Sequence, residues 1–178
     1  MKARILVWLV ALFCCHNASF AQKEFVNTSV RLSGHPRILL QKGEEKALKK
    51  VIMKDAVWKD IHQSLVDEAG EIVKLPLNER IKTGRRLLSV SRENLRRIFI
   101  LSYAYRMTGK SEFLKRAESE MLKAASFSDW NPSHFLDVGE MTMALAIGYD
   151  WLYPQLSVQT KREIENAIVE KGLKPSFD

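Results

Sequence analysis

Two stretches of this sequence carry the same spacing of large apolar residues at an offset of 46 residues, and each is followed by a turn and a second amphipathic segment. The matching pairs are Leu95 with Met141, Phe99 with Leu145, Leu101 with Ile147, Tyr103 with Tyr149 and Tyr105 with Trp151. A period of this length is typical of repeated helical hairpins, in which each hairpin buries its apolar face against the next. The pattern therefore predicts an all-α chain built from antiparallel helical hairpins.

Apolar residues at helical spacing predict where the individual helices lie. Thr108-Gly109-Lys110 and Pro154 are typical helix ends, and Ser91 and Ser157 are typical helix caps. The segment between Glu71 and Val90 is less regular, because Pro76 and Gly84 interrupt it. We expect helices over residues 44–70, 78–88, 91–107, 111–126, 129–153 and 157–170.

The first 21 residues have the composition of a cleavable export signal. Lys2 and Arg4 precede an apolar run that is too short to span a bilayer, and small residues precede a cleavage position between Ala21 and Gln22. A lipoprotein signal that uses Cys14 or Cys15 is the alternative, but a bulky residue precedes each of these cysteines. We expect a periplasmic or secreted protein.

Residues 22–34 are polar and aperiodic, which predicts a flexible lead-in to the folded part. Both cysteines of the chain lie inside the predicted signal, so the mature chain would contain neither a disulfide nor a zinc site with cysteine ligands. No cofactor is expected. The stability of residues 35–178 must then come from a buried apolar core.

The formal net charge is +7, and loss of Lys2 and Arg4 would lower it by two. This mild excess suits an anionic partner, and an exported protein meets polysaccharide more often than nucleic acid. Beyond the signal, no apolar run is long enough for a membrane helix, so no membrane span is expected in the mature chain.

Three motifs together resemble the N-terminal region of the heparinase II/III-like polysaccharide lyases. The first is His35-Pro36-Arg37-Ile38-Leu39-Leu40 with the acidic helix start at Glu44-Glu45, and the second is the hairpin from Tyr103 to Lys123. The third is Trp130-Asn131-Pro132-Ser133-His134-Phe135, which runs into Gly148-Tyr149-Asp150-Trp151-Leu152. The resemblance covers most of residues 35–174, and the order and spacing of the motifs carry it.

This resemblance implies an incomplete (α/α) toroid, normally followed by β-sandwich domains, in an exported enzyme that cleaves uronate-containing polysaccharide by β-elimination. That chemistry requires neutralisation of the uronate carboxylate, a base for the C5 proton and an acid for the leaving oxygen. In the family an Asn-His pair, a Tyr and a further His do this work. No Asn-His pair follows the predicted signal here, so no catalytic residue is carried over.

The chain ends in Lys174-Pro175-Ser176-Phe177-Asp178, a loop-like run with no capping repeat. We therefore expect residues 35–178 to be the N-terminal part of a toroid domain, with further C-terminal domains missing, and inactive alone. A glycosaminoglycan or alginate is the expected partner, and the sequence does not distinguish between these polymers. A non-catalytic helical-repeat module that binds glycan or peptide is the rival, although repeats of the tetratricopeptide kind have about 34 residues.

Trp130, His134 and Glu140 are the candidate substrate-binding residues. The indole of Trp130 could stack on a sugar ring or staple the helix start, and His134 could bind a carboxylate or serve structure alone. Asn131 and Pro132 are explained by a helix cap and first turn. Glu140 lies among apolar residues, so it is either paired in the core or faces a polar cleft.

Other polar residues have structural explanations. His134, Asp137 and Glu140 are spaced by three but drift round the helix, so no metal site is expected. Asp150 is expected to pair with an arginine or with backbone amides. A basic run could guide an acidic chain or form a solvated face, and it comprises Arg85, Arg86, Arg92, Arg96 and Arg97.

Overall fold

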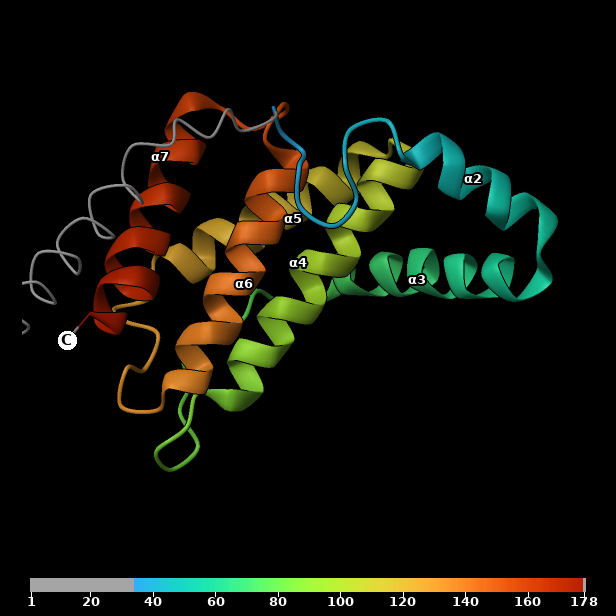
Figure 1. Cartoon of the computed structure of the whole chain (residues 1–178). Coiled ribbons are helices and arrows are strands. Elements are labelled where there is room, and N and C mark those ends of the chain that lie inside the picture. Colours follow the sequence, from blue (N-terminus) through green and yellow to red (C-terminus); the bar gives the residue numbers. More distant parts are fainter. Residues whose placement is uncertain (1–33, 178) are drawn as a thin grey trace, which may run out of the picture. The chain divides into compact units, whose positions relative to one another are not determined.

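Six α-helices make up most of residues 34–177, the part of the chain that the computed structural model describes, and they form three successive hairpins (Figure 1). Their bounds are α2 Glu45–Lys54, α3 Ala56–Lys74, α4 Leu88–Thr108, α5 Ser111–Ala125, α6 Phe135–Leu152 and α7 Val158–Ala167. A π-helical segment, Ile168–Leu173, and a 3-10 turn, Lys174–Ser176, continue α7. Between residues 34 and 177 there is no strand, which confirms the predicted all-α class. The predicted signal and nearly all of the predicted lead-in lie outside the described residues.

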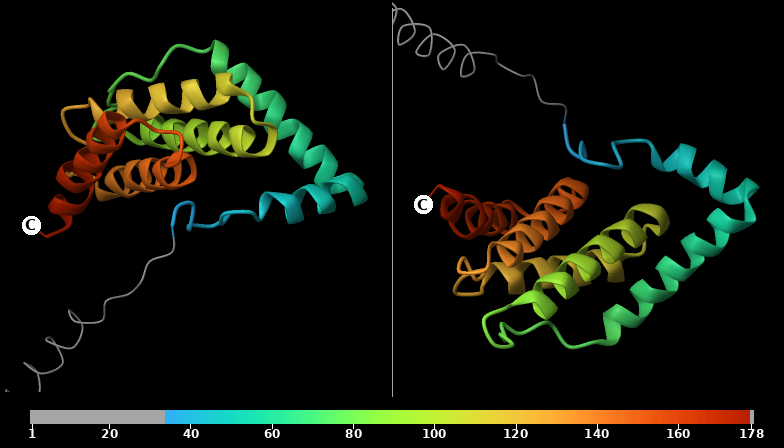
Figure 2. Two further views of the ribbon diagram at one scale, coloured as in Figure 1. Left: turned by 90° about the horizontal axis from the view of Figure 1, so that it is seen from above. Right: turned by 60° about the horizontal axis from the view of Figure 1, so that its bottom comes forward.

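Helices α4 and α6 lie side by side and parallel (Figures 1 and 2). Near their first turns, Ser91 of α4 donates a hydrogen bond to Glu140 of α6 at 2.6 Å. Near their last turns, the guanidinium of Arg106 in α4 lies 5.1 Å from the ring centre of Trp151 in α6. Helix α5 packs on α4, α3 packs on both of them, and α7 packs on α5. The packing of one hairpin against the next is what the repeat predicts, whereas a toroid, which needs more hairpins than these, remains a prediction.

Small residues let the helices approach closely in the core. A Cβ atom on Gly148 of α6 would lie 2.5 Å from Cγ2 of Ile98 and 2.6 Å from Sδ of Met121. The side chains around this contact are large and fully buried, and they include Leu101, Phe113, Met121, Met141 and Leu145. The core therefore lies where α4, α5 and α6 meet.

The prediction of one helix over residues 44–70 is wrong, because Asp55 divides it into α2 and α3. Its backbone is extended, with φ −125° and ψ 122°. Its carboxylate accepts hydrogen bonds from the backbone N–H groups of Val57, at 2.9 Å, and Trp58, at 3.2 Å. These bonds satisfy donors that a new helix leaves free. Periodicity missed the break because both helices carry apolar faces.

The predicted helix over residues 78–88 and the predicted cap at Ser91 are also wrong. The chain forms a loop that closes in a two-residue turn, where the backbone N–H and C=O groups of Thr83 and Arg86 bond one another at 2.9 and 3.2 Å. Gly84 takes a φ of +60° in this turn, a value that glycine adopts at little cost. Helix α4 then begins at Leu88, and Ser91 lies inside it.

Helix ends farther along the chain agree better with the sequence. Gly109 ends α4 with a φ of +75°, and Ser157 caps α7 by accepting a hydrogen bond from the backbone N–H of Thr160 at 3.0 Å. Helix α6 ends before Pro154 as predicted but begins only at Phe135, six residues after the predicted start at residue 129. The reason lies at Asn131 and is described with the candidate site.

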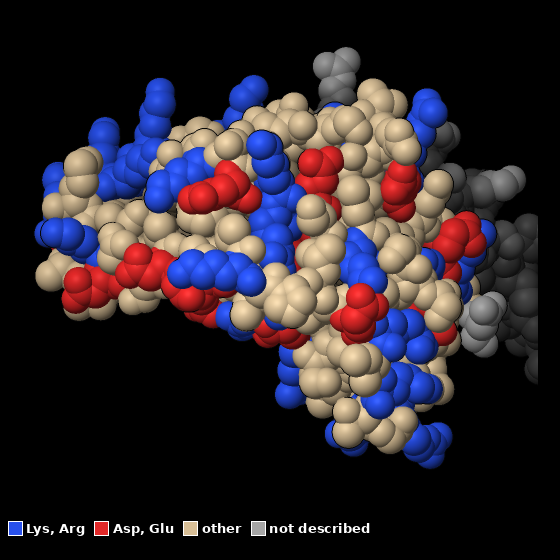
Figure 3. Space-filling model, turned by 180° about the vertical axis from the view of Figure 1, so that it is seen from behind, with Lys and Arg blue, Asp and Glu red and all other residues tan. Residues whose placement is uncertain are grey.

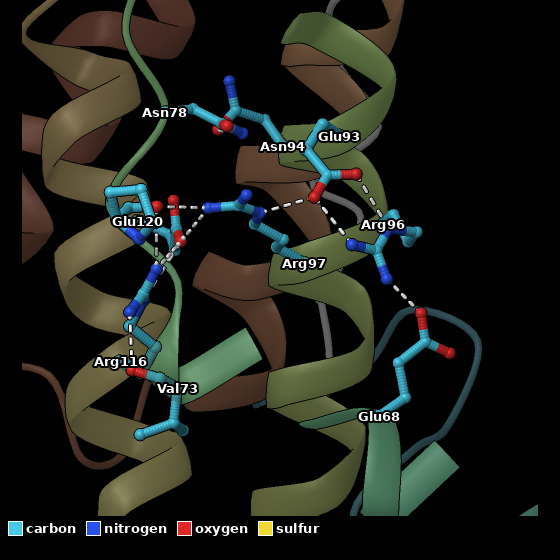
Figure 4. A network of polar contacts seen from close by, with 10 residues as sticks. Glu68, Val73, Asn78, Glu93, Asn94, Arg96, Arg97, Arg116 and Glu120 are labelled. Atoms are coloured by element: carbon cyan, nitrogen blue, oxygen red, sulfur yellow. Dashed lines mark hydrogen bonds and ion pairs between the residues drawn. The ribbon is translucent and has the colours of Figure 1, made fainter. Parts of the chain in front are cut away.

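A buried carboxylate anchors the loop between α3 and α4 (Figure 4). Glu120 of α5 is fully buried, and its Oε1 accepts from Arg97 at 3.1 Å and from Arg116 at 2.7 Å. The same two arginines donate to the backbone oxygen of Pro76, and Arg116 also donates to that of Val73 at 2.8 Å. The network ties the end of α3 and the start of the loop to α4 and α5.

Candidate functional site

The first turns of α4 and α6 meet at one end of the molecule, and the buried carboxylate of Asp137 joins them. Its Oδ2 accepts from the backbone N–H of Leu87 and from the side-chain amide of Asn131, both at 2.7 Å. Burial alone would raise the pKa of Asp137, but these bonds hold that pKa below its ordinary value. Asp137 is therefore an ionised structural anchor beneath this end.

Asn131 was predicted to cap α6, and that prediction is wrong. Its φ is +61°, a left-handed value that asparagine tolerates better than most residues. Its amide donates to Asp137 and also, at 2.9 Å, to the backbone oxygen of Arg85. The residue that precedes α6 is His134, whose side chain makes no capping hydrogen bond. Asn131 thus connects the loop that carries Arg85 to Asp137. Because its side chain makes these contacts, it does not cap a helix, and α6 begins later than predicted.

Trp130 lies in the core. Its exposed fraction is 0%, and its indole N–H donates to the backbone oxygen of Ala124 at 3.1 Å. Because no face of the indole reaches solvent, the described structure offers no surface of Trp130 on which a sugar could stack.

His134 lies at the surface directly above Asp137. Its side chain is 28% exposed, and Nδ1 is 3.4 Å from Oδ2 of Asp137. The contact is not aligned as a hydrogen bond, so Nδ1 has no hydrogen-bond partner within residues 34–177. The contact is therefore electrostatic, because a poorly aligned donor makes only a weak hydrogen bond. His134 is the predicted site residue that remains accessible to a ligand.

Glu140 is paired across the two parallel helices. It accepts from the hydroxyl of Ser91 at 2.6 Å and from Nε of Arg92 at 3.1 Å, and its side chain is largely buried. The sequence left open whether Glu140 is paired in the core or faces a polar cleft, and this geometry matches the paired carboxylate. Glu140 therefore holds Arg92 against the site.

Basic side chains surround this surface, and we call it the basic end. It consists of Lys82, Arg85, Arg86 and Arg92 around the first turns of α4 and α6, and Figure 3 shows lysine and arginine atoms gathered there, at the bottom of the view. Arg85 and Arg86 are exposed. The positive ends of two helix dipoles point the same way, although Asp137 offsets part of their field. Arginine forks at such a surface suit carboxylate or sulfate groups.

Not every arginine of the predicted basic run belongs to this surface. Arg96 pairs with Glu93 and Glu68, and Arg97 pairs with Glu93 and the buried Glu120 (Figure 4). Both side chains are therefore engaged in structural ion pairs. The sequence could not separate the two groups, because the acidic partners of Arg96 and Arg97 come from three different helices.

The opposite end of α6 carries a second junction, built on Asp150. Its carboxylate accepts from Nδ1 of His35 at 2.6 Å and from the backbone N–H groups of Arg37 and Ile38, each at 2.8 Å. The predicted structural pairing of Asp150 is confirmed. Trp151 donates to the backbone oxygen of Ile38 at 2.8 Å, so residues 35–38 are fastened to the end of α6.

Arg106 completes this junction from α4. It binds Glu45 at 2.5 Å and the backbone oxygens of Leu40 and Gln41, and its guanidinium lies 5.1 Å from the ring centre of Trp151. A cavity of about 390 Å³ opens beside it. Its polar and aromatic lining includes His35, Lys42, Glu45, Tyr105, Arg106 and Trp151.

Comparison of the sequence with protein-family models and with curated proteins finds no match. Among residues 34–177 no cluster of three or more histidine, cysteine, aspartate or glutamate residues has the geometry to hold a metal ion. Within the same range no helix is both long and apolar enough to cross a membrane. The chemistry that the described site offers is the binding of anions by arginine, lysine and histidine.

Proposed function

We propose that the chain forms the N-terminal helical portion of an exported polysaccharide lyase that cleaves uronate-containing acidic polysaccharide by β-elimination. In this proposal the helical portion is part of an (α/α) toroid, binds the polymer and supplies no catalytic base or acid. The missing Asn-His pair is the reason for assigning it binding alone.

The observation that carries the proposal is the junction at Asp150. The three motifs that resemble the lyase family lie far apart in the sequence, yet residues from each meet there. Arg37 and Ile38 come from the first, Arg106 from the second, and Asp150 and Trp151 from the third. A shared packing site explains why the motifs occur together, and this supports the view that their co-occurrence marks one kind of fold.

The basic end supports the choice of an acidic polymer. Exposed Arg85 and Arg86 lie in a turn that Asn131 and Asp137 hold in place, so their guanidinium groups start from an ordered backbone. Arginine binds carboxylate and sulfate through two parallel hydrogen bonds, and pre-ordering lowers the entropy cost of binding. The partly exposed imidazole of His134 adds a further hydrogen-bonding group.

Elimination leaves a carbon–carbon double bond in the new sugar end, and that bond absorbs ultraviolet light. The test incubates the native protein with heparan sulfate, alginate and pectate and follows this absorbance. We expect one of the uronate polymers to give unsaturated products, and we expect residues 34–178 alone to bind that polymer without cleaving it. Absence of unsaturated products from every uronate polymer tested would contradict the proposal.

The rival function is a non-catalytic helical-repeat module for glycan or peptide. Helices α4 and α5 have 21 and 15 residues, so the two helices of this hairpin alone exceed a whole repeat of about 34 residues. This observation favours the lyase portion. Tight binding of a polymer by the native protein, without any cleavage, would favour the module.

A further inference from the structure

The corner between α2 and α3 projects from the body of the helical unit (Figure 2). Its end, residues 53–58, is called the α2–α3 tip. Large apolar side chains lie exposed there: Met53 at 75%, Val57 at 66% and Trp58 at 48%. Along α3 the exposure of the large apolar side chains falls from Val57 through Ile61, at 45%, to Ile72, which is buried. Exposed apolar clusters of this kind mark interaction surfaces.

Lysines frame the tip. Helix α2 carries four exposed lysines, Lys46, Lys49, Lys50 and Lys54, and a single acid, Glu45, which Arg106 already binds. Helical spacing places Met53 on the same face as Lys46, Lys49 and Lys50. Figure 3 shows lysine and arginine atoms along the upper edge of this corner and acidic atoms along its lower edge.

We propose that the α2–α3 tip binds an anionic membrane surface. A projecting apolar end fits a bilayer interface, which deforms around it, better than a rigid protein surface, which would need a matching pocket. Lysines beside the tip would bind anionic headgroups, and tryptophan is enriched at the boundary between headgroups and acyl chains. A polysaccharide offers no apolar phase for Met53 and Val57. This inference is independent of the proposed lyase activity.

Trp58 provides the readout. Trp130 and Trp151 are buried, whereas Trp58 is exposed. Among the described tryptophans, Trp58 is therefore the one whose surroundings would change when the tip binds. The experiment adds the full chain to vesicles of phosphatidylcholine, with or without phosphatidylglycerol, and records tryptophan emission. The difference between wild type and Trp58→Phe removes the signal of the other tryptophans. We expect a blue shift with the anionic vesicles that salt reverses; absence of that shift would overturn the proposal.

Two matched pairs of variants locate the contact. Val57→Asp and Val158→Asp each alter a 66% exposed valine in the first turn of a helix, and only Val57→Asp should abolish the shift. Lys49→Glu with Lys50→Glu should weaken vesicle binding by at least about 25-fold, because each lysine near the surface contributes about five-fold. Arg85→Glu with Arg86→Glu makes the same charge change at the basic end and should leave vesicle binding nearly intact.

Each other outcome contradicts the proposal. Equal losses in Val57→Asp and Val158→Asp would mean that the tip is not the contact. A blue shift that grows with protein concentration in the absence of vesicles would mean that a second copy of the chain covers the tip. Circular dichroism of every variant checks that the helices remain folded.

Discussion

Glu120 shows how one buried side chain can hold several segments at once. It is fully buried between Arg97 and Arg116, and its Oε2 has no partner in the described part of the chain. Sequence patterns did not predict this role, because Glu120 lies in an amphipathic helix rich in charge. Its partners became apparent only when α3, α4 and α5 were brought together.

Replacing Glu120 with alanine should lower the free energy of unfolding by about 3–5 kcal/mol, because it leaves two arginines without their buried counter-charge. Chemical denaturation measures the change. Glu71→Ala removes a partner from the exposed Lys74–Glu71 pair and should cost at most about 1 kcal/mol. Equal effects of the two substitutions would contradict the assigned role of Glu120.

Gly148 is the second residue whose importance depends on packing. Gly148→Ala should destabilise the protein by about 1–3 kcal/mol, since the added methyl group would overlap Ile98 and Met121. Gly139→Ala in the same helix is the control, because nothing lies within 4 Å of its added Cβ. That control should stabilise the protein by up to about 1 kcal/mol through helix propensity. Thermal unfolding that ranks the variants in the opposite order would refute this packing.

At the scale of elements, the sequence patterns located α4, α5, α6 and α7 but merged α2 with α3 and placed a helix over residues 78–88, where the chain forms a loop. The ends at Gly109 and before Pro154 were read correctly because glycine and proline act locally. The starts at Asp55 and Phe135 depend on where polar side chains find partners. Asn131 prefers Asp137 and the Arg85 carbonyl to a capping position, and such distant partners leave no local pattern.

Asp55→Ala tests the break between α2 and α3. Loss of the two cap bonds should cost about 0.5–2 kcal/mol, and hydrogen exchange should speed up at the amides of Val57 and Trp58, which lose their acceptor. Asp67→Ala in the same helix, where the exposed carboxylate accepts a hydrogen bond from the side chain of Gln63, is the control. Unchanged exchange at Val57 and Trp58 would contradict the cap.

Asp137 joins α4 to α6, and its lowered pKa makes that junction sensitive to acid. A depressed carboxyl pKa contributes stability that is present above the unfolded pKa, near 3.8, and is lost as pH falls through the folded pKa. Asp137→Asn should therefore be less stable than wild type near neutral pH, and the difference should shrink below about pH 4. Urea midpoints over this pH range measure it; a difference independent of pH would contradict an ionised Asp137.

At the scale of the whole molecule, the parallel packing of α4 and α6 gives the helical unit two different ends. Their first turns meet under the basic end, and their last turns meet at the Asp150 junction. The repeat predicted that the two hairpins pack against each other, and the parallel contact of α4 with α6 is how they do so. The assignment of Trp130 to a ligand surface could not be judged without the fold, since an aromatic residue before a helix suits either a core or a cleft.

Binding of acidic polysaccharide by the basic end is the central claim, and titration calorimetry of the full chain with heparan sulfate and alginate oligosaccharides tests it most directly. We predict binding of at least one of them that weakens with salt and falls by about ten-fold or more in Arg85→Glu with Arg86→Glu. Lys49→Glu with Lys50→Glu, which has the same net charge, should bind nearly as well as wild type. Equal losses in the two double variants, or no binding of either polymer, would contradict the claim.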